Sequence, residues 1–304
     1  MSRLLFGAGA HGESVRTIQQ KLTDAGFDTH GVDGAYGTGT VNAVKAFQQK
    51  HGLAVTGSVD DVTWTALTSS PIPSLRDRCL GLTSTFEGHG YTLAQGNFDG
   101  AGVTWGIIGF TLKGGELSKI IEDANARDAA LLNDCFGNGA STLMTVCRES
   151  WDQQLAWADS VSSGSSKTTL AEPYKSGFAK LGESSVGQQL QQARVDADYY
   201  QPALATAKAY GLESELGIAL CFDIHVQNGG IASSAGYKVR AQMTPGMSEK
   251  DVRVLIANAV ADHASAAWRE DVRTRKLTVA TGEGTVHGVQ YVLANWGLSE
   301  EPAT

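Results

Sequence analysis

The segment Ser69-Ser70-Pro71-Ile72-Pro73-Ser74 most constrains how this chain can fold. Proline fixes its own φ angle, lacks a backbone N–H and disfavours a helical conformation in the residue before it. Two prolines within this segment therefore interrupt any helix and favour an extended, semi-rigid spacer. The spacer divides the chain into residues 1–68 and 75–304, and a chain of 304 residues is long enough for two domains.

The part before the spacer shows the pattern of a small helical domain. Over residues 12–25, Val15, Ile18 and Leu22 recur on one helical face. Two further short segments with apolar faces follow, separated by turns that contain glycine. We therefore predict a compact domain of three helices over residues 1–68.

The part after the spacer is also predicted to be mainly helical. Leu75, Cys79, Leu82 and Phe86 follow helical spacing in a helix that ends at Glu87. A glycine-rich stretch then predicts a β-hairpin. Further helices are predicted over residues 115–125, 127–136, 139–161, 184–210 with Pro202 as a kink, 212–227, 248–269 and 286–296. The predicted fold class is mainly α, with a larger α domain over residues 75–304 that carries a short β-hairpin lobe.

Two carboxylates are held apart by this short hairpin. Glu87 ends the helix, Asp99 follows in the glycine-rich turn, and Thr104 lies beyond it. Hydrolysis of a glycosidic bond needs such a pair, one to protonate the leaving oxygen and one to handle water or the developing cation. Leu82 and Phe86 give Glu87 apolar surroundings, which favour the protonated form that a general acid needs. Asp99, which lies among glycines, is expected to be ionised. The Thr104 hydroxyl is expected to hold the water molecule. The structural alternatives are an exposed helix-end carboxylate, an ordinary Asp-Gly turn and a plain strand residue.

Weaker candidates lie near the end of a later helix. His225 and Asn228 can line a sugar cleft, or they can be a buried core histidine and a helix-capping asparagine. Asp223 can form an ion pair with Arg273 or Arg275 that steadies the general acid. The basic stretch Arg273-Thr274-Arg275-Lys276 can close the site or form a solvated turn, and the solvated turn is the favoured interpretation.

Composition excludes several classes of partner. The net charge of −8 argues against nucleic acid, and no apolar run approaches the ~20 residues that span a bilayer. The first residues lack the apolar region of a secretory signal, so we expect the protein to remain in the cytoplasm where it is made. The 4 cysteines and 7 histidines show no CxxC or HExxH spacing, so neither a metal nor another cofactor is expected. Free buried thiols are favoured over a disulfide between Cys135 and Cys147.

The first domain carries a recurrent motif. It consists of Asp33-Gly34-Ala35-Tyr36-Gly37, Thr40-Val41, Ala43-Val44, Phe47-Gln48, Gly52-Leu53, Gly57 and Thr63-Trp64. This pattern resembles the three-helix peptidoglycan-binding domain of many cell-wall hydrolases, over nearly all of residues 10–68. The resemblance implies peptidoglycan as the ligand, and Tyr36, beside the turn, is the candidate for contact with sugar or peptide.

The larger domain carries a second motif, in two stretches. They are Thr85-Phe86-Glu87 with residues 99–110, and residues 191–230, which begin with Gln191-Gln192-Ala193-Arg194-Val195-Asp196. Both stretches resemble the chitosanases of glycoside hydrolase family 46, in the lysozyme-like superfamily. The resemblance implies that Glu87 is the general acid, that Asp99 orients or activates the water and that Thr104 helps to hold it. It also favours inversion at the anomeric carbon.

Departures from the family pattern bear on the substrate. The interval between the two carboxylates is shorter than in typical chitosanases, and Ala101 replaces the usual Arg between two glycines. The hairpin region carries His89, Gln95 and Asn97 rather than the carboxylate cluster that suits cationic chitosan. A peptidoglycan-binding domain on the same chain shifts the expected substrate to the peptidoglycan glycan, and this combination resembles modular endolysins of phages of Gram-negative hosts.

We therefore predict a monomeric endolysin that binds peptidoglycan and hydrolyses the β-1,4 bond between N-acetylmuramic acid and N-acetylglucosamine. It is expected to leave the host cytoplasm for the periplasm and cell wall with a helper such as a holin. A chitosanase with a wall-binding module and a lytic transglycosylase, in which Asp99 is dispensable, stay open as alternatives. A zinc amidase or peptidase and a non-catalytic wall-binding protein are weighed below these.

Overall fold

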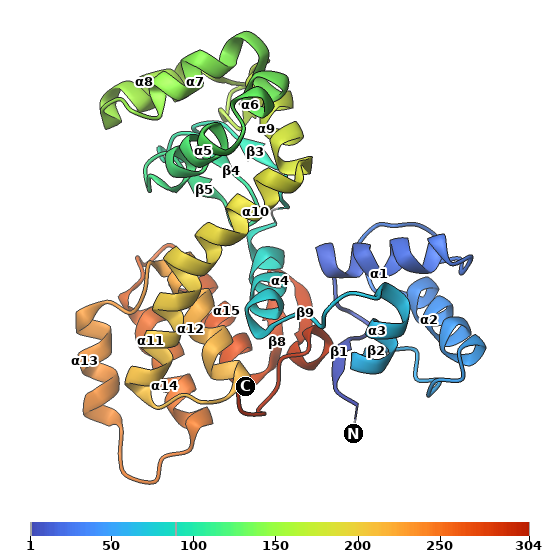
Figure 1. Cartoon of the computed structure of the whole chain (residues 1–304). Helices are drawn as coiled ribbons and strands as arrows, with labels where there is room; N and C mark the ends of the chain where they lie inside the picture. Colours follow the sequence, from blue (N-terminus) through green and yellow to red (C-terminus); the bar gives the residue numbers. More distant parts are fainter. Residues whose placement is uncertain (1, 89, 304) are drawn as a thin grey trace. The chain divides into compact units, whose positions relative to one another are not determined.

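The computed structural model describes residues 2–88 and 90–303, which form two compact units (Figure 1). One unit combines Met1–Phe86 with Tyr199–Thr304, and the other is Glu87–Asp198. Helices dominate both units, which confirms the mainly α class. The two units group residues that contact one another and are not divided at residues 69–74. The domain boundaries drawn from the sequence at this segment therefore stay a prediction.

The N-terminal part of the first unit contains the three predicted helices and two short strands that the sequence did not suggest. Val15, Ile18 and Leu22 are buried, and the buried Gln19 amide bridges the following turn by accepting from Gly34 N at 2.7 Å. Strands β1 and β2 pair in antiparallel orientation. The elements are β1 (Leu4–Phe6), α1 (Glu13–Asp24), α2 (Thr38–Lys50), β2 (Val59–Asp60) and α3 (Asp61–Thr68).

The rest of this unit surrounds one buried helix. Leu216 to Phe222 are buried on every side of α12, as their continuous apolar run implies. The elements are α4 (Leu75–Glu87), α11 (Gln201–Tyr210), α12 (Glu215–Asn228), α13 (Ser233–Gln242), α14 (Glu249–His263), α15 (Arg269–Thr281), β8 (Glu283–Val286), β9 (Val289–Val292) and the short 3-10 helix η3 (Leu293–Trp296).

Of the helices predicted in this unit, one is wrong and another is too long. The helix predicted over 286–296 is instead the β8–β9 hairpin followed by η3. His287 and Gly288 adopt φ angles of 51° and 80°, and two successive left-handed residues make the tight turn that joins twisted antiparallel strands. The helix predicted over 248–269 ends at His263, and a new helix, α15, begins at Arg269.

The second unit contains a small sheet covered by helices. Strands β3 (Ala94–Gln95), β4 (Thr104–Trp105) and β5 (Phe110–Thr111) form it in that order, all antiparallel. The rings of Trp105 and Phe136 lie 5.5 and 5.0 Å from that of Phe178, and all three are buried. The other elements are α5 (Glu116–Arg127), α6 (Ala129–Phe136), η1 (Gly137–Gly139), α7 (Ala140–Val146), α8 (Trp151–Val161), β6 (Ser162–Ser163), β7 (Thr169–Leu170), α9 (Tyr174–Glu183) and α10 (Ser185–Arg194).

Two long predicted helices are interrupted. The one over 139–161 breaks before Ser150, whose side chain forms a capping box with Gln153 and so starts α8. The one over 184–210 becomes α10, a π-helical segment (Val195–Tyr200) and α11. Pro202 lies in the first turn of α11, where a proline costs no hydrogen bond and requires no kink.

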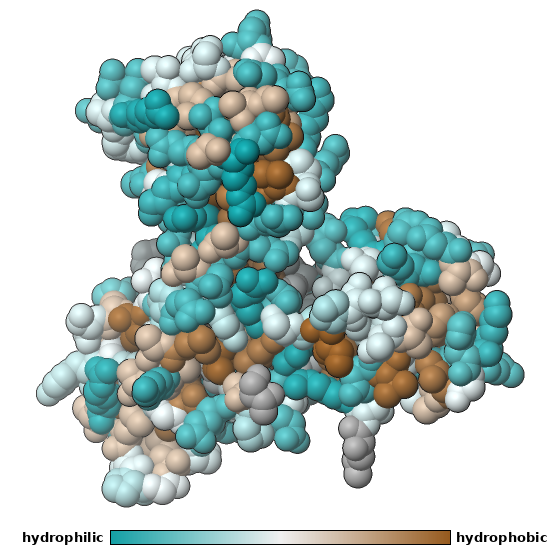
Figure 2. All heavy atoms as spheres, in the orientation of Figure 1, coloured by the Kyte–Doolittle hydropathy of each residue, from teal (hydrophilic) through white to brown (hydrophobic). Residues whose placement is uncertain are grey.

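On the face shown in Figure 2, hydrophobic residues form scattered patches between hydrophilic ones. No helix among the described residues is long and apolar enough to cross a membrane. Cys79, Cys135, Cys147 and Cys221 are all buried and free, as the favoured interpretation of the sequence holds.

Candidate active site

Glu87 is the last residue of helix α4, and the end of this helix positions it. Leu82 and Phe86 on the inner face of this helix are buried, and Glu87 itself is half-buried. Gly88 follows with a φ angle of 67°, the left-handed conformation that commonly ends a helix and that glycine adopts without strain. The carboxyl group is therefore held at a defined helix end, between an apolar interior and solvent.

Asp99 lies in a turn that is held by its own hydrogen bonds. Its Oδ1 accepts from Ala101 N at 2.9 Å, while the side chain stays exposed to solvent. Across the turn, the buried Asn97 accepts from Gly102 N at 2.9 Å and donates to Asp159 Oδ1 at 2.7 Å. Asn97 thus fixes the loop that presents the Asp99 carboxylate, a structural role that the sequence did not reveal.

Thr104 carries an unusual hydroxyl group. It lies on the central strand β4, opposite Gln95 in the register, and only 6% of it is exposed. Its Oγ1 is buried and has no hydrogen-bond partner within the described part of the chain. A buried hydroxyl without a partner costs stability. We therefore expect this group to bind a water molecule or a substrate atom, as the proposed water-holding role requires.

Replacing Thr104 with valine tests this assignment, because valine keeps the shape and removes the hydroxyl. We expect Thr104→Val to leave the melting temperature unchanged or to raise it, because no protein hydrogen bond is lost. Turnover is expected to fall by about tenfold or more, as for other groups that hold a reacting water. Thermal unfolding and glycan cleavage of the same preparation check both parts. A loss of stability with full activity would make Thr104 a purely structural residue.

Gln191 of α10 forms hydrogen bonds with both ends of the hairpin region. Its side chain is fully buried, accepts from Ile107 N at 2.9 Å and donates to Tyr91 O at 2.9 Å. A Cβ atom at Gly106 would lie 2.4 Å from Gln191 Oε1, so only glycine fits between the strand and this amide. The sequence suggested Gln191 only through the family resemblance, and its role proves to be in joining two segments that flank the candidate site.

In the first unit, Asp223 is the centre of a buried ionic cluster. It accepts from Arg275 Nη2 at 2.7 Å, from Lys276 Nζ at 2.5 Å and from Thr83 Oγ1 at 3.1 Å. Burial alone would raise the pKa of Asp223, but Arg275 and Lys276 together lower it to about 2. The Arg275 guanidinium also lies 4.9 Å from the centre of the Phe86 ring. The cluster thus supports the last turn of α4, one residue before Glu87.

The interpretation of this basic stretch as a solvated turn is wrong. Arg275 and Lys276 lie within helix α15 and are buried. Of the two arginines considered as partners of Asp223, Arg275 is the one that binds it, whereas Arg273 pairs with Asp262 at 2.6 Å. The sequence did not suggest Lys276 as a partner of Asp223. Lys276 lies four residues after Val272, a buried position of the same helix. This helical spacing indicates that Lys276 lies on the inner face of the helix.

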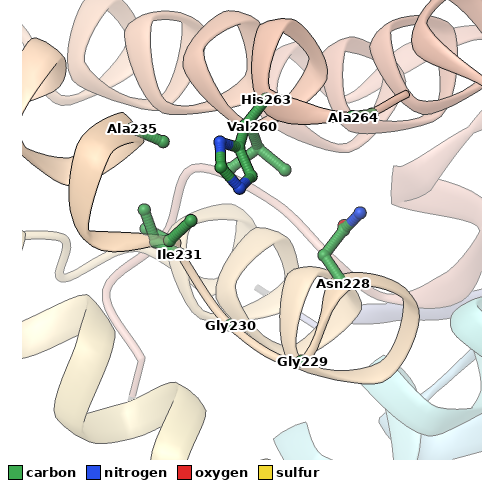
Figure 3. A pocket seen from close by; sticks show the side chains of 9 residues that line it. Asn228, Gly229, Gly230, Ile231, Ala235, Val260, His263 and Ala264 are labelled. Atoms are coloured by element: carbon green, nitrogen blue, oxygen red, sulfur yellow. The ribbon is translucent and has the colours of Figure 1, made fainter. Parts of the chain in front are cut away.

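His225 and Asn228 share helix α12 but have different surroundings. His225 is half-buried, its Nε2 lies 2.8 Å from Thr206 Oγ1, and burial lowers its pKa. Asn228 is exposed at the end of the helix and lines a pocket of about 220 Å³ with His263 and Val260. Figure 3 shows the side chains of Asn228 and His263 at this pocket. Asn228 is thus accessible to a ligand, while His225 makes an internal contact.

Tyr36 does not have the surroundings that its predicted role requires. It is only 2% exposed, and its hydroxyl donates to Gly57 O at 3.0 Å inside the N-terminal domain. The aromatic ring fills the core of a very small domain instead of projecting from it. Tyr36 nevertheless forms part of the lining of a pocket of about 620 Å³, together with His11, Arg16 and small residues of the adjoining turns.

Within residues 2–88 and 90–303, no group of three or more His, Cys, Asp or Glu side chains is placed to hold a metal ion. His89, noted in the sequence beside the hairpin, lies outside the described residues. What the site offers is a carboxyl group at a helix end, an exposed carboxylate on a braced turn and a buried hydroxyl, a set suited to acid–base catalysis with water.

Two segments of the chain match the models of known protein families. Residues 11–67 match the family described as a peptidoglycan binding domain. Residues 151–253 match glycosyl hydrolase family 46. This second match includes Gln191 and Asp223 but begins after Glu87, Asp99 and Thr104, so it does not itself assign these three residues.

Curated relatives match only a stretch the size of the peptidoglycan-binding domain. The chain is 46% identical over 52 residues to N-acetylmuramoyl-L-alanine amidase CwlM of Mycobacterium tuberculosis, or 17% of this chain and 13% of the relative. It is 46% identical over 61 residues to N-acetylmuramoyl-L-alanine amidase CwlL of Bacillus licheniformis, or 19% and 17%. It is 49% identical over 56 residues to the spore cortex-lytic enzyme of Bacillus cereus, or 18% and 22%. The chain therefore spans a small fraction of the length of these relatives.

Solved structures match the larger part. The family 46 chitosanase of Gynuella sunshinyii, in complex with chitotetraose, is similar over 74% of this chain and 99% of its own, with a TM-score of 0.51 and 19% identity. The native chitosanase of Bacillus subtilis is similar over 70% of this chain and 88% of its own, with a TM-score of 0.51 and 20% identity. At these identities the similarity shows the fold. The chain therefore joins a peptidoglycan-binding domain to a domain with the fold of the family 46 glycoside hydrolases in one modular polypeptide.

Proposed function

We propose that this protein is a phage endolysin that attaches to peptidoglycan and hydrolyses its glycan strands. The bond cleaved is the β-1,4 bond between N-acetylmuramic acid and N-acetylglucosamine. One observation carries the proposal: a domain that matches a peptidoglycan-binding family is on the same chain as a family 46 fold. Attachment to a wall polymer is useful to a glycosidase only if the wall contains its substrate.

The site residues support a single-displacement mechanism. Glu87 donates its proton to the glycosidic oxygen as the bond from that oxygen to the anomeric carbon breaks. A water molecule held by Thr104 attacks the same carbon from the opposite face, and Asp99 orients it and takes up its proton. This sequence inverts the anomeric configuration and consumes one water for each bond cleaved.

The few charged side chains of the hairpin region favour a neutral glycan over chitosan as the substrate. Chitosan is a cation, and its recognition requires carboxylates in the cleft. Between residues 90 and 106, Asp99 is the acidic residue, and the other polar side chains are amides and hydroxyls. Chitosan nevertheless stays the second candidate, because solved structures with this fold include a chitosanase bound to chitotetraose.

The proposal includes where the protein acts. We propose that it is made in the cytoplasm of an infected host and reaches the periplasm and cell wall with a helper such as a holin. It acts there as a monomer. Asn228, exposed at its pocket, is proposed to contact the glycan; the internal contact of His225 supports the helix end that carries Asn228.

Mass spectrometry of digested peptidoglycan tests the function. We expect fragments with reducing N-acetylmuramic acid ends from the wild-type protein and no change in soluble chitosan. Anhydro ends would instead identify a lytic transglycosylase, and free stem peptides an amidase. Faster cleavage of chitosan than of peptidoglycan would overturn the proposed substrate while leaving the glycosidase chemistry in place.

A further inference from the structure

The N-terminal domain contacts the rest of its unit more extensively than attachment to the cell wall alone would require. A wall anchor needs only a flexible tether, and residues 69–74 are predicted to be a spacer. Both prolines of the spacer are held instead: Trp64 Nε1 donates to Pro71 O at 3.0 Å, and Arg78 Nη1 donates to Pro73 O at 2.8 Å. The connection therefore has a fixed conformation at both prolines.

The backbone of the N-terminal strand also lies directly against η3. Gly7 N donates to Asn295 O at 3.3 Å, and Asn295 Nδ2 donates to Ala8 O at 2.8 Å. A Cβ atom at Gly297 would lie 3.2 Å from Leu5 Cα, so the two segments approach as closely as glycine permits. Backbone contact of this kind is a property of a permanent interface.

A buried carboxylate secures the same interface. Glu215 of α12 is 1% exposed and accepts from Arg78 of α4 at 2.5 Å. Its second cationic partner is Arg3, from the N-terminal end of the chain, and Ser299 N donates to its other oxygen at 3.2 Å. Arg3 therefore ties the N-terminal domain to a buried carboxylate, and separation of the domain would remove one of the two cationic partners of Glu215.

The contact extends to the helix that ends at Glu87. A Cβ atom at Gly12 would lie 3.5 Å from Thr85 Cγ2, so Gly12 of the N-terminal domain faces α4 with room for little more than a methyl group between them. His11 Nε2 lies 3.3 Å from the Tyr291 hydroxyl, and Thr85 Oγ1 donates to that hydroxyl at 3.4 Å. The Tyr291 ring lies 4.8 Å from the Phe86 ring. Residues 11 and 12 therefore support the last turn of α4, directly and through Tyr291.

We infer that the peptidoglycan-binding domain positions the catalytic helix as well as attaching the enzyme to the wall. Thr85 and Phe86 immediately precede Glu87, so a displacement of this turn displaces the general acid. A misplacement of about 1 Å can cost on the order of 100-fold in rate. His11 and Tyr291 are thus positioning residues. The inference rests on the proposed function through the catalytic role of Glu87.

Kinetics on a soluble substrate separate positioning from attachment. Glycan strands freed of stem peptides are cleaved by the full-length protein and by His11→Ala, Tyr291→Phe and the double variant. We expect each single change to lower kcat by about three- to tenfold with KM nearly constant, and the double variant to lose less than the product. Lys21→Ala, on the exposed face of α1, is the matched control and should change neither constant. Melting temperatures confirm that each variant is folded.

Hydrogen exchange provides a measurement that does not depend on activity. Backbone amides of residues 82–87 should exchange faster in His11→Ala than in the wild type, and at the wild-type rate in Lys21→Ala. Unchanged exchange and unchanged kcat in His11→Ala, with or without weaker retention on the wall, would show that the domain is only an anchor. If the wild-type protein cleaves no glycan, the proposed function fails, and the exchange rates still decide whether the domain supports α4.

Discussion

Glu87→Gln is expected to abolish cleavage of the glycan while leaving the protein folded. The amide is nearly isosteric with the carboxyl group but has no proton to donate to the leaving oxygen, and general acid catalysis contributes about 10²–10⁴-fold to such reactions. Glu87 is half-buried at the end of α4, so the substitution removes no core packing. Release of reducing ends from peptidoglycan, measured against time, gives the loss directly.

A matched variant controls for the change of charge. Glu183→Gln makes the same replacement at the exposed end of α9 in the same unit and should keep full activity. Wall binding by Glu87→Gln should equal that of the wild type, since the N-terminal domain is unchanged. Lysis of cell walls at the wild-type rate by Glu87→Gln would remove this residue from the mechanism.

Asp223→Asn is expected to have the largest effect on stability. The substitution leaves Arg275 and Lys276, both buried, without the carboxylate that neutralises them. Removing one partner from a buried charge cluster typically costs about 3–5 kcal/mol. Chemical denaturation should therefore show a much lower midpoint for Asp223→Asn, whereas Asp134→Asn, the same change at an exposed position of α6, should leave it nearly unchanged.

The same carboxylate predicts how stability depends on pH. Its pKa is lowered from 3.8 to about 2 in the folded protein, so the folded state favours the ionised form. Its contribution is fully present above pH 3.8 and is lost as the pH falls through about 2, because protonation then removes the negative charge that faces the two cations. Wild-type stability should decline across this window more steeply than that of Asp223→Asn. Equal declines in the two proteins would show that Asp223 is not the group that titrates.

Much of the candidate site follows from local patterns. Helical spacing of Leu75, Cys79, Leu82 and Phe86 predicts a helix that ends at Glu87, and the structure confirms it. The following glycines predict a hairpin, and Asp99 and Thr104 do lie on its turn and strand. Patterns of this kind are readable because periodicity, caps and turn residues act over a few neighbouring positions.

Other features depend on partners that are distant in the chain. Tyr36 beside a turn suggests exposure, yet it is buried, because a very small domain needs each large ring for its core. Arg275 and Lys276 suggest a solvated turn, yet both are buried. Their charges are neutralised by Asp223 on another helix, a partner that no local pattern identifies.

The sequence by itself determined the mainly α class, the N-terminal three-helix domain and the order of the candidate catalytic residues along the chain. Only the tertiary structure decided that the N-terminal domain lies against α4, that Glu215 joins Arg3 to Arg78, and that the Thr104 hydroxyl is buried without a partner in the described chain. The physical reason is that periodicity and turn chemistry are local. The burial of a charge or a hydroxyl depends instead on which distant residues surround it.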